Sequence, residues 1–310
     1  MEAWSGLFEA TVRVAIPILL AVIGEVVAER AGVLNVGIEG MMLFGAFGAF
    51  AGAWTWGTPW AGLLVGVLAA VLLAAVFSVF VIRASFDPIV TGVAVNVLSL
   101  GLTGVLFRAM TSGTVRSLSV DTFPAVPLPV LAGIPVLGPA LFAQNALGYA
   151  AFALAALAAV FLARTTPGLL LRAAGENPEA VETAGTDVRR VRFLATLFGG
   201  ACAGAAGAYL STGYSDTFVE GMSAGRGFVA LAIVVFARWS PWGGLGGALL
   251  FGLAMSLQVR LQGRNLLGAE IPYQFFQALP YALTLAVLAR SSRLGAGAPA
   301  ALAKPFVRER

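Results

Sequence analysis

The chain contains no histidine, one cysteine (Cys202) and one lysine (Lys304) among its 310 residues. Without histidine, the common zinc sites and any Cys–His nucleophile are excluded, and a single cysteine cannot form a disulfide within the chain. The lysine stands in AKPF, so the chain lacks the GxxxxGK[ST] loop that holds nucleotide phosphates. The sequence therefore predicts no catalytic residue, no metal site and no cofactor bound by this chain.

Charge is scarce as well. Only 11% of the residues are charged and 59% are hydrophobic, whereas an ordinary soluble domain has roughly 25% charged residues. Apolar runs of about 20 residues, the length that crosses a bilayer, recur along the chain. They predict an all-α, polytopic transmembrane helical bundle of about nine to ten spans. The candidate spans are 7–27, 32–55, 59–82, 88–110, 145–163, 193–213, 218–237, 242–260 and 273–290.

The loops predict on which side of the membrane each span begins and ends. We expect one transmembrane domain over 1–290, with a cytoplasmic loop at 164–192, an external proline-rich loop at 111–144 and a loose basic cytoplasmic tail at 291–310. This arrangement puts most of the 19 basic residues inside, as the positive-inside rule requires, and the N-terminus outside. If 32–55 instead holds a re-entrant piece and a span, the N-terminus changes sides.

The basic excess is thus assigned to the inner face of a membrane, and no nucleic-acid partner is expected. The first apolar run lacks the basic start of a signal peptide, so it is expected to remain as a span of a multi-pass protein in the bacterial cytoplasmic (inner) membrane. No strong internal repeat is evident in the sequence.

The densest group of charges lies at 175–192, where the sequence reads GENPEAVETAGTDVRRVR. Asn177 is a favourable helix cap, and Pro178 suits the first helical position. Gly185 is a natural helix stop. The pattern predicts a helix of about two turns over 178–184, which is too short to be stable alone in water.

Two interpretations of this charged segment stay open. It is either an ordinary solvated loop or a helix that docks on a water-soluble partner. In the second case Glu179 and Glu182, three residues apart on one helical face, are available to basic or amide groups of that partner.

Glu39 is the acid that the sequence places deepest in the membrane. It lies nine residues beyond Arg30, about 13 Å along a helix. Acids at such depth are costly and point to a functional site. Asn35 shares its face if the helix is continuous, although Gly37 and Gly40 could break it. The pair lines a substrate path or gate, or it is a buried hydrogen-bonded bracket that holds the helix.

A polar stripe runs along the span 88–110. Asn96, Ser99 and Thr103 share one helical face by their spacing. They either line an aqueous path or form hydrogen bonds with neighbouring helices.

Three stretches carry a resemblance to a known family. EAVETAG at 179–185 resembles the cytoplasmic E-A-A-x-x-x-G motif of ABC importer permeases, with valine at the third position. ERAGVLNVGIEGMMLFGAF at 29–47 is similar to the nucleoside branch of the permeases that also serve ribose and related sugars, as is GMSAGRGFVALAIVVFARWSPWGGLGGALLFG at 221–252. The similarity runs in order from about residue 10 to 290.

The resemblance implies a type II-like permease subunit that moves a nucleoside or a related ribosyl or sugar solute. It implies that an ABC ATP-binding subunit binds and hydrolyses the ATP, that a second, distinct permease chain completes the pore as a heterodimer, and that an extracytoplasmic lipoprotein or solute-binding protein delivers the solute. The family's coupling helix, which sits in a groove of the ATP-binding subunit, would contain Asn177, Pro178, Glu179, Ala180, Glu182 and Gly185.

Two other function classes fit the residues less well. An ion-coupled secondary transporter usually has several acids or histidines at mid-membrane and repeated broken helices, but Glu39 is nearly alone and has no matching partner in the second half. A membrane-embedded enzyme would need a nucleophile–base set or a metal cluster, and neither is evident.

Overall fold

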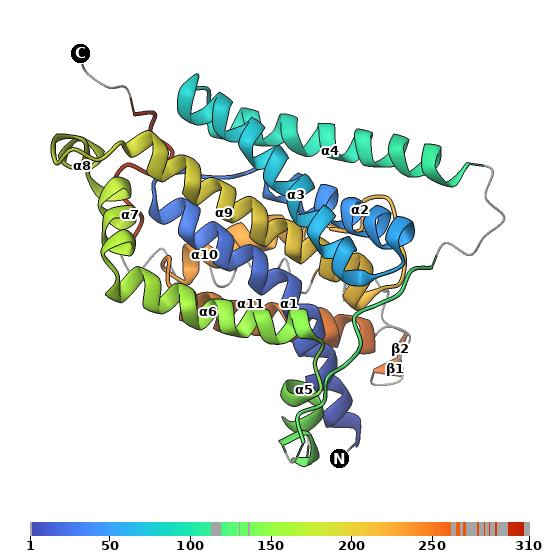
Figure 1. The fold of residues 1–310 in the computed structure, drawn as a ribbon. Helices are drawn as coiled ribbons and strands as arrows, with labels where there is room; N and C mark the ends of the chain where they lie inside the picture. The colour runs from blue at the N-terminus through green and yellow to red at the C-terminus, as the bar shows by residue number, and fades with distance from the viewer. Residues whose placement is uncertain are drawn as a thin grey trace.

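The computed structural model describes residues 2–112, 119–129, 131–135, 137–261, 265–266, 269–270, 278, 282, 285, 289 and 297–306. The long elements are helices, which are packed in one bundle (Figure 1). They are α1 (Glu2–Arg30), α2 (Ile38–Trp56), α3 (Pro59–Ser78), α4 (Pro88–Thr111), α5 (Leu137–Phe142), α6 (Ala146–Arg164), α7 (Thr166–Glu176), α8 (Pro178–Thr183), α9 (Val188–Tyr209), α10 (Arg226–Phe236) and α11 (Pro241–Leu261).

Short irregular elements complete the fold. The π-helical turns η1 (Val79–Arg83) and η3 (Leu210–Tyr214) extend α3 and α9, and the 3₁₀ turn η2 (Leu131–Gly133) precedes α5. β1 (Asn265–Leu266) and β2 (Ala269–Glu270) form a minimal antiparallel pair.

Six helices in the described part of the chain are long and apolar enough to cross a membrane. These six, which coincide with predicted spans, are Ser5–Arg30, Pro59–Arg83, Pro88–Thr111, Ala146–Arg164, Val188–Tyr214 and Pro241–Leu261. The predicted class, an all-α polytopic membrane protein, is confirmed.

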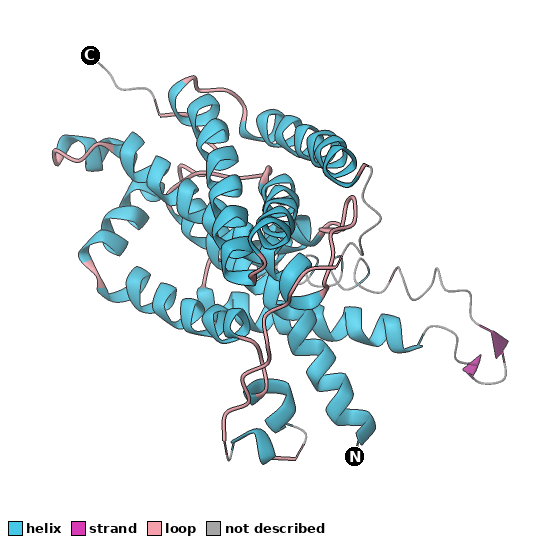
Figure 2. Ribbon diagram, turned by 45° about the vertical axis from the view of Figure 1, so that its right-hand side comes forward, coloured by secondary structure: helices cyan, strands magenta, loops and turns pink. Residues whose placement is uncertain are grey.

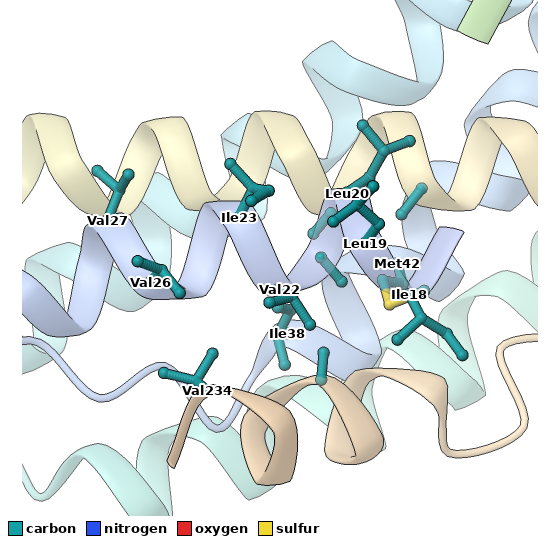
Figure 3. Packing of buried hydrophobic residues seen from close by; sticks show 14 of the residues in the cluster. Ile18, Leu19, Leu20, Val22, Ile23, Val26, Val27, Ile38, Met42 and Val234 are labelled. Atoms are coloured by element: carbon teal, nitrogen blue, oxygen red, sulfur yellow. The ribbon is translucent and has the colours of Figure 1, made fainter. Parts of the chain in front are cut away.

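α1 lies at the centre of the bundle and is the main contributor to its core. Ile16, Ile18, Val22, Ile23 and Val26 have no exposed surface. Figure 3 shows such side chains in contact with Ile38 and Met42 of α2 and Val234 of α10, while α9 runs alongside. Residues 14–24 of α1 are apolar on every side, and such a helix is expected to be enclosed by other helices.

The predicted span 32–55 is wrong at its start. α1 ends where Gly32 takes a φ of +94°, and the Gly32 N–H donates to the Glu29 carbonyl at 2.9 Å. Residues 33–37 are then non-helical, and α2 begins only at Ile38. The buried Asn35 N–H donates to Glu25 Oε1 at 2.9 Å, which places Asn35 beside a point ten residues back along the chain. This segment therefore turns back into the bundle as a re-entrant piece that leads directly into α2. The N-terminus does not change sides as the alternative interpretation of 32–55 required, because the N-terminal part of α1 lies at the same end of the bundle as α5, which is part of the loop 111–144 (Figure 1).

The predicted span 218–237 is also too long. Gly221, Ala224 and Gly225 have φ values of +73°, +48° and +79°, which a continuous helix does not allow. Only α10 is helical, and it ends at a turn in which Arg238 and Trp239 both have a φ of +54°. The last predicted span, 273–290, lies outside the described residues except for four isolated positions.

The bundle has two distinct ends. The first, called the α8 end, carries α7, α8, the C-terminus of α1 and residues 297–306 (Figure 1). The second, called the α5 end, carries the N-terminal part of α1, α5 and the proline-rich loop, which lie together in Figures 1 and 2.

The proline-rich loop is joined to η3 and the residues that follow it, because the N–H groups of Val120 and Phe123 donate to the carbonyls of Asp216 and Thr212 at 2.7 and 2.9 Å. Loops 111–144 and 164–192 thus lie at opposite ends.

The C-terminal tail is not loose over residues 297–306. The Ala301 N–H donates to the Gly175 carbonyl at 2.9 Å, and the Ala303 N–H donates to the Gly32 carbonyl at 3.1 Å. Ala301 is 7% exposed. The expectation of a loose tail is wrong here because these main-chain groups find partners at the end of α1 and α7.

Candidate functional site

The segment between α7 and α9 folds as its caps predict. Asn177 Oδ1 accepts a hydrogen bond from the Ala180 N–H at 3.1 Å, and Pro178 takes the first position of α8. Gly185 follows the helix with a φ of +88°, and its N–H donates to the Glu182 carbonyl at 3.0 Å. The observed helix ends at Thr183, one residue before the predicted end.

Most of the predicted coupling residues are accessible. Asn177, Glu179, Ala180 and Gly185 are exposed at the α8 end. Glu182 has a second task, because its Oε2 accepts a hydrogen bond from the Val188 N–H at 3.1 Å and so helps to begin α9. Glu179 is thus the more exposed of the two acids.

The second predicted region lies where α2 and α10 begin. Glu39 Oε1 accepts a hydrogen bond from the Gly225 N–H at 2.8 Å, and Oε2 accepts one from the Gly227 N–H at 2.7 Å. The carboxylate therefore caps the N-terminus of α10, where unpaired N–H groups and the helix dipole favour an anion. Glu39 keeps part of its surface accessible. This junction joins the starts of two helices that are distant in sequence, α2 with 19 residues and α10 with 11.

Asn96 of α4 holds the same junction from the other side. Its Oδ1 accepts from the Gly40 N–H at 2.7 Å, and its Nδ2 donates to the Val36 carbonyl at 2.9 Å. The side chain satisfies two backbone groups that the start of α2 leaves unpaired. Asn96 therefore binds the re-entrant segment.

Asn35 does not share a helical face with Glu39, because α2 starts after it. Its side chain is fully buried, and its Nδ2 lies 3.4 Å from Met41 Sδ. Ser99 and Thr103 are also fully buried, and their hydroxyls donate to the carbonyls of Val95 and Ser99 at 2.8 and 2.7 Å. The polar stripe of α4 thus faces the protein and bonds largely to its own backbone.

Sequence reasoning missed two buried acids on α1. Glu25 and Glu29 are 0% and 1% exposed. Glu25 accepts from the Asn35 N–H at 2.9 Å, and Glu29 accepts from the Trp239 indole N–H at 2.5 Å. The sequence did contain a signal for them, because two acids four residues apart in an apolar run lie on one face of a helix and must find partners there.

Sequence reasoning also missed the role of Arg192, which it counted only among the basic residues at the inner face of the membrane. Arg192 is only 4% exposed, and its guanidinium donates to main-chain carbonyls. Nε donates to the Ala31 carbonyl at 3.1 Å, and Nη1 to the Lys304 carbonyl at 2.9 Å. Longer contacts of 3.5 Å reach the carbonyls of Ala174 and Ala301. One side chain therefore joins the ends of α1 and α7 to the tail.

The chemistry of these sites is that of binding and positioning. No group of three or more Cys, Asp or Glu side chains within the described ranges could hold a metal ion. The acids that lie inside the bundle accept hydrogen bonds from N–H groups at helix ends and from an indole.

Comparison with known proteins shows what kind of protein contains these sites. The family model described as "Branched-chain amino acid transport system / permease component" matches residues 7–288. The chain is 39% identical to a putative glucose ABC transporter permease of Haloferax volcanii, over all of this chain and 99% of the relative. It is 36% identical to a nucleoside ABC transporter permease of Lactococcus lactis, over 88% of each chain. It is 34% identical to a guanosine ABC transporter permease of Bacillus subtilis, over 96% of this chain and 95% of the relative. In each of these organisms a second ABC permease also matches this chain.

These similarities decide between the function classes. Permeases of ABC importers work with a separate ATP-binding subunit and a solute-binding protein, so this chain is not itself an enzyme and is not an ion-coupled transporter. The six apolar helices agree with a multi-pass protein of the cytoplasmic membrane. From the match over residues 7–288, the chain belongs to the family of branched-chain amino acid-type transport system permease components, and it is the membrane-spanning permease subunit of an ABC importer.

Proposed function

We propose that this permease translocates a nucleoside. The observation that carries the substrate class is the similarity to permeases named for nucleoside and guanosine transport, which align with 88% and 96% of this chain. The relative named for glucose transport is 39% identical. A hexose is therefore the second candidate.

The proposed contact with the ATP-binding subunit is α8 with its flanking residues. Asn177, Glu179, Ala180 and Gly185 are exposed there, on a helix whose two ends are fixed by a cap and a glycine stop. A short helix held in this way transmits a push or pull to α7 and α9, which flank it. Glu182 contributes by holding the start of α9.

The proposed substrate path passes the junction of α2, α4 and α10. Discontinuous helices whose ends meet inside a bundle are common at transport sites. Glu39 is a half-buried polar group at this junction, and Asn96, which is also half-buried, braces the loop that leads into α2. Asn35, Ser99 and Thr103 support the junction from buried positions.

The proposed complex contains two different permease chains. The support is that each of the three organisms above has a second matching ABC permease. Copurification of this chain with a related but distinct permease is the expected result, and uptake by this chain with an ATP-binding subunit and binding protein alone contradicts the proposal.

Uptake by the complete transporter in vesicles tests the substrate class. Labelled guanosine is expected to accumulate only with ATP, and unlabelled nucleosides are expected to compete for it. Competition by glucose with no competition by nucleosides would assign the second candidate instead.

The variant Gly185→Asp tests the coupling contact. Gly185 has a φ of +88°, which aspartate tolerates better than most residues, and a Cβ added to it would have no neighbouring atom within 4 Å, so the main effect of the substitution is an added charge. Uptake is expected to collapse while insertion and assembly persist. Gly185→Asn is the matched control, because asparagine and aspartate have similar size and a similar tolerance of this backbone conformation, whereas asparagine adds no charge, and it should be milder. Wild-type uptake by Gly185→Asp contradicts the coupling role.

A further inference from the structure

The C-terminal residues 297–306 are attached to the same end of the bundle as α8. Besides the main-chain bonds from Ala301 and Ala303, the Ala300 N–H donates to Glu176 Oε2 at 3.2 Å, immediately before α8. Arg192 holds the same segment through the carbonyls of Ala301 and Lys304. The segment is therefore bound on both sides of the connection between α7 and α9.

Phe306 extends this attachment to the small core under α8. Ala174 of α7, Val181 of α8 and Val188 of α9 form a separate apolar cluster, in which they are 0%, 5% and 0% exposed. Phe306 packs against this cluster. Val181 is the one buried residue of α8. The tail thus supplies part of the apolar surface on which α8 rests.

α8 needs such support because of its length. It has six residues, and isolated helices shorter than about 12 residues are marginal in water. Its cap and its glycine stop satisfy backbone groups, but they do not fix where the helix lies. The position of α8 depends on the contacts made by Val181 and its neighbours.

The same tail also reaches the re-entrant segment. Arg192 donates to the carbonyl of Ala31 as well as to that of Lys304, and Ala303 donates to Gly32. The tail walls a cavity of about 230 Å³ whose lining includes Gly32, Asp87 and Arg189. The tail is therefore in contact both with α8's core and with the chain that leads to the α2–α10 junction.

We propose that residues 297–306 are a positioning element for α8, with Phe306 as the positioning residue that sets how α8 meets the ATP-binding subunit. This rests on the proposed coupling role of α8. The tail keeps α8 in place against α7 and α9, and through Arg192 it ties that position to the end of α1.

The test is Phe306→Ala in the assembled transporter, with two measurements. Hydrogen exchange of the amides of residues 177–187 is expected to be about five- to thirtyfold faster, as for a local structure that has lost part of its apolar contact. The amount of solute moved per ATP hydrolysed is expected to fall, while assembly and ATP hydrolysis without solute are retained. Phe306→Leu, which keeps an apolar contact, should restore most of both.

Lys304→Ala is the matched control. Its side chain is exposed, and the bond to Arg192 uses its main-chain carbonyl, so this variant should behave like the parent. Parent-like exchange and coupling in Phe306→Ala overturn the inference. If Phe306→Ala does not assemble, hydrogen exchange and the amount of solute moved per ATP hydrolysed are measured on the less severe variant Phe306→Val.

The Gly185→Asp variant separates the two proposals. If it couples normally, the coupling role of α8 fails, whereas exchange at 177–187 still reports whether Phe306 positions the helix. If it uncouples while Phe306→Ala does not, only the role of the tail fails.

Discussion

At the scale of single residues, the acids inside the bundle accept hydrogen bonds. The donors are N–H groups of non-helical backbone, N–H groups at the start of a helix, and one indole N–H. Glu39 accepts from Gly225 and Gly227, and Glu25 accepts from Asn35. A buried N–H without a partner costs free energy in an apolar environment, and a bilayer offers no water to satisfy it. These carboxylates therefore satisfy N–H groups that the broken helices leave without a backbone partner.

The variant Glu39→Gln is expected to destabilise the permease. A glutamine offers one carbonyl oxygen, so only one of the two N–H groups at the start of α10 keeps an acceptor. Leaving a buried donor unsatisfied costs about 1–3 kcal/mol. Thermal unfolding of the purified permease measures this loss, and uptake by the assembled transporter should fall with it.

Glu220→Gln is the control for that substitution. Glu220 forms a 2.6 Å ion pair with Arg108, and the two side chains are 46% and 62% exposed. Exposed ion pairs contribute little, so this variant should unfold like the parent. Equal unfolding temperatures for Glu39→Gln and the parent would show that the hydrogen bonds from Gly225 and Gly227 to Glu39 do not stabilise the permease. Any loss of uptake would then come from a role of Glu39 in the substrate path.

At the scale of elements, glycines set how closely the helices approach. A Cβ on Gly45 would lie 2.6 Å from Gly204 Cα, and one on Gly207 would overlap the Met42 carbonyl. Close contact of this kind is the usual role of small residues in membrane helices. Not every glycine has this role, because a Cβ on Gly246 of α11 would meet nothing within 4 Å.

The variant Gly227→Ala tests the close approach of α2 and α10. The added Cβ would lie 2.7 Å from both the N and Cα atoms of Glu39, where backbone would have to move. Overpacking of this kind costs typically about 1–3 kcal/mol. The unfolding temperature of the purified permease is expected to fall.

Gly246→Ala is the matched control, since the same methyl group is added to an exposed helical position. Alanine favours a helix over glycine by about 1 kcal/mol, so this variant should be as stable as the parent or slightly more stable. A similar loss in both variants would mean that the α2–α10 contact is not the cause.

At the scale of the whole molecule, the two broken spans enter the bundle from opposite ends. Residues 31–37 turn back from the α8 end and lead into α2, which runs to the α5 end. Residues 215–225 return from the α5 end and lead into α10, whose far end meets Arg30 through the Trp239 carbonyl at 3.0 Å. The broken span that contains α2 and the one that contains α10 therefore run in opposite directions through the bundle, an arrangement common in transporters.

Surface labelling tests the sidedness that this arrangement implies. Gly185 and Pro127 are both exposed and lie at opposite ends of the bundle. In a Cys202→Ala background, a cysteine at 127 should react with an impermeant maleimide in intact cells, and a cysteine at 185 should react only after the membrane is opened. Labelling of position 185 from outside would reverse the orientation.

The sequence by itself determined the class of this protein and much of its local structure. Long apolar runs specify membrane helices because a bilayer excludes unpaired backbone. The α8 segment was predicted to within one residue because Asn177, Pro178 and Gly185 act on the backbone next to them. The three quoted stretches also indicated the family that the comparison confirmed.

Only the tertiary structure decided which polar groups meet. Glu39 with Gly227, Glu29 with Trp239 and Arg192 with Lys304 are separated by more than a hundred residues of chain. Hydropathy marked both broken spans as continuous because it does not register a change of backbone conformation: residues 33–37 and 218–225 adjoin apolar runs without being helical themselves. For 32–55 the glycines left a break open, but the sequence could not place it. The attached tail was missed for a related reason, because it is held mainly by main-chain N–H and carbonyl groups, which every sequence contains.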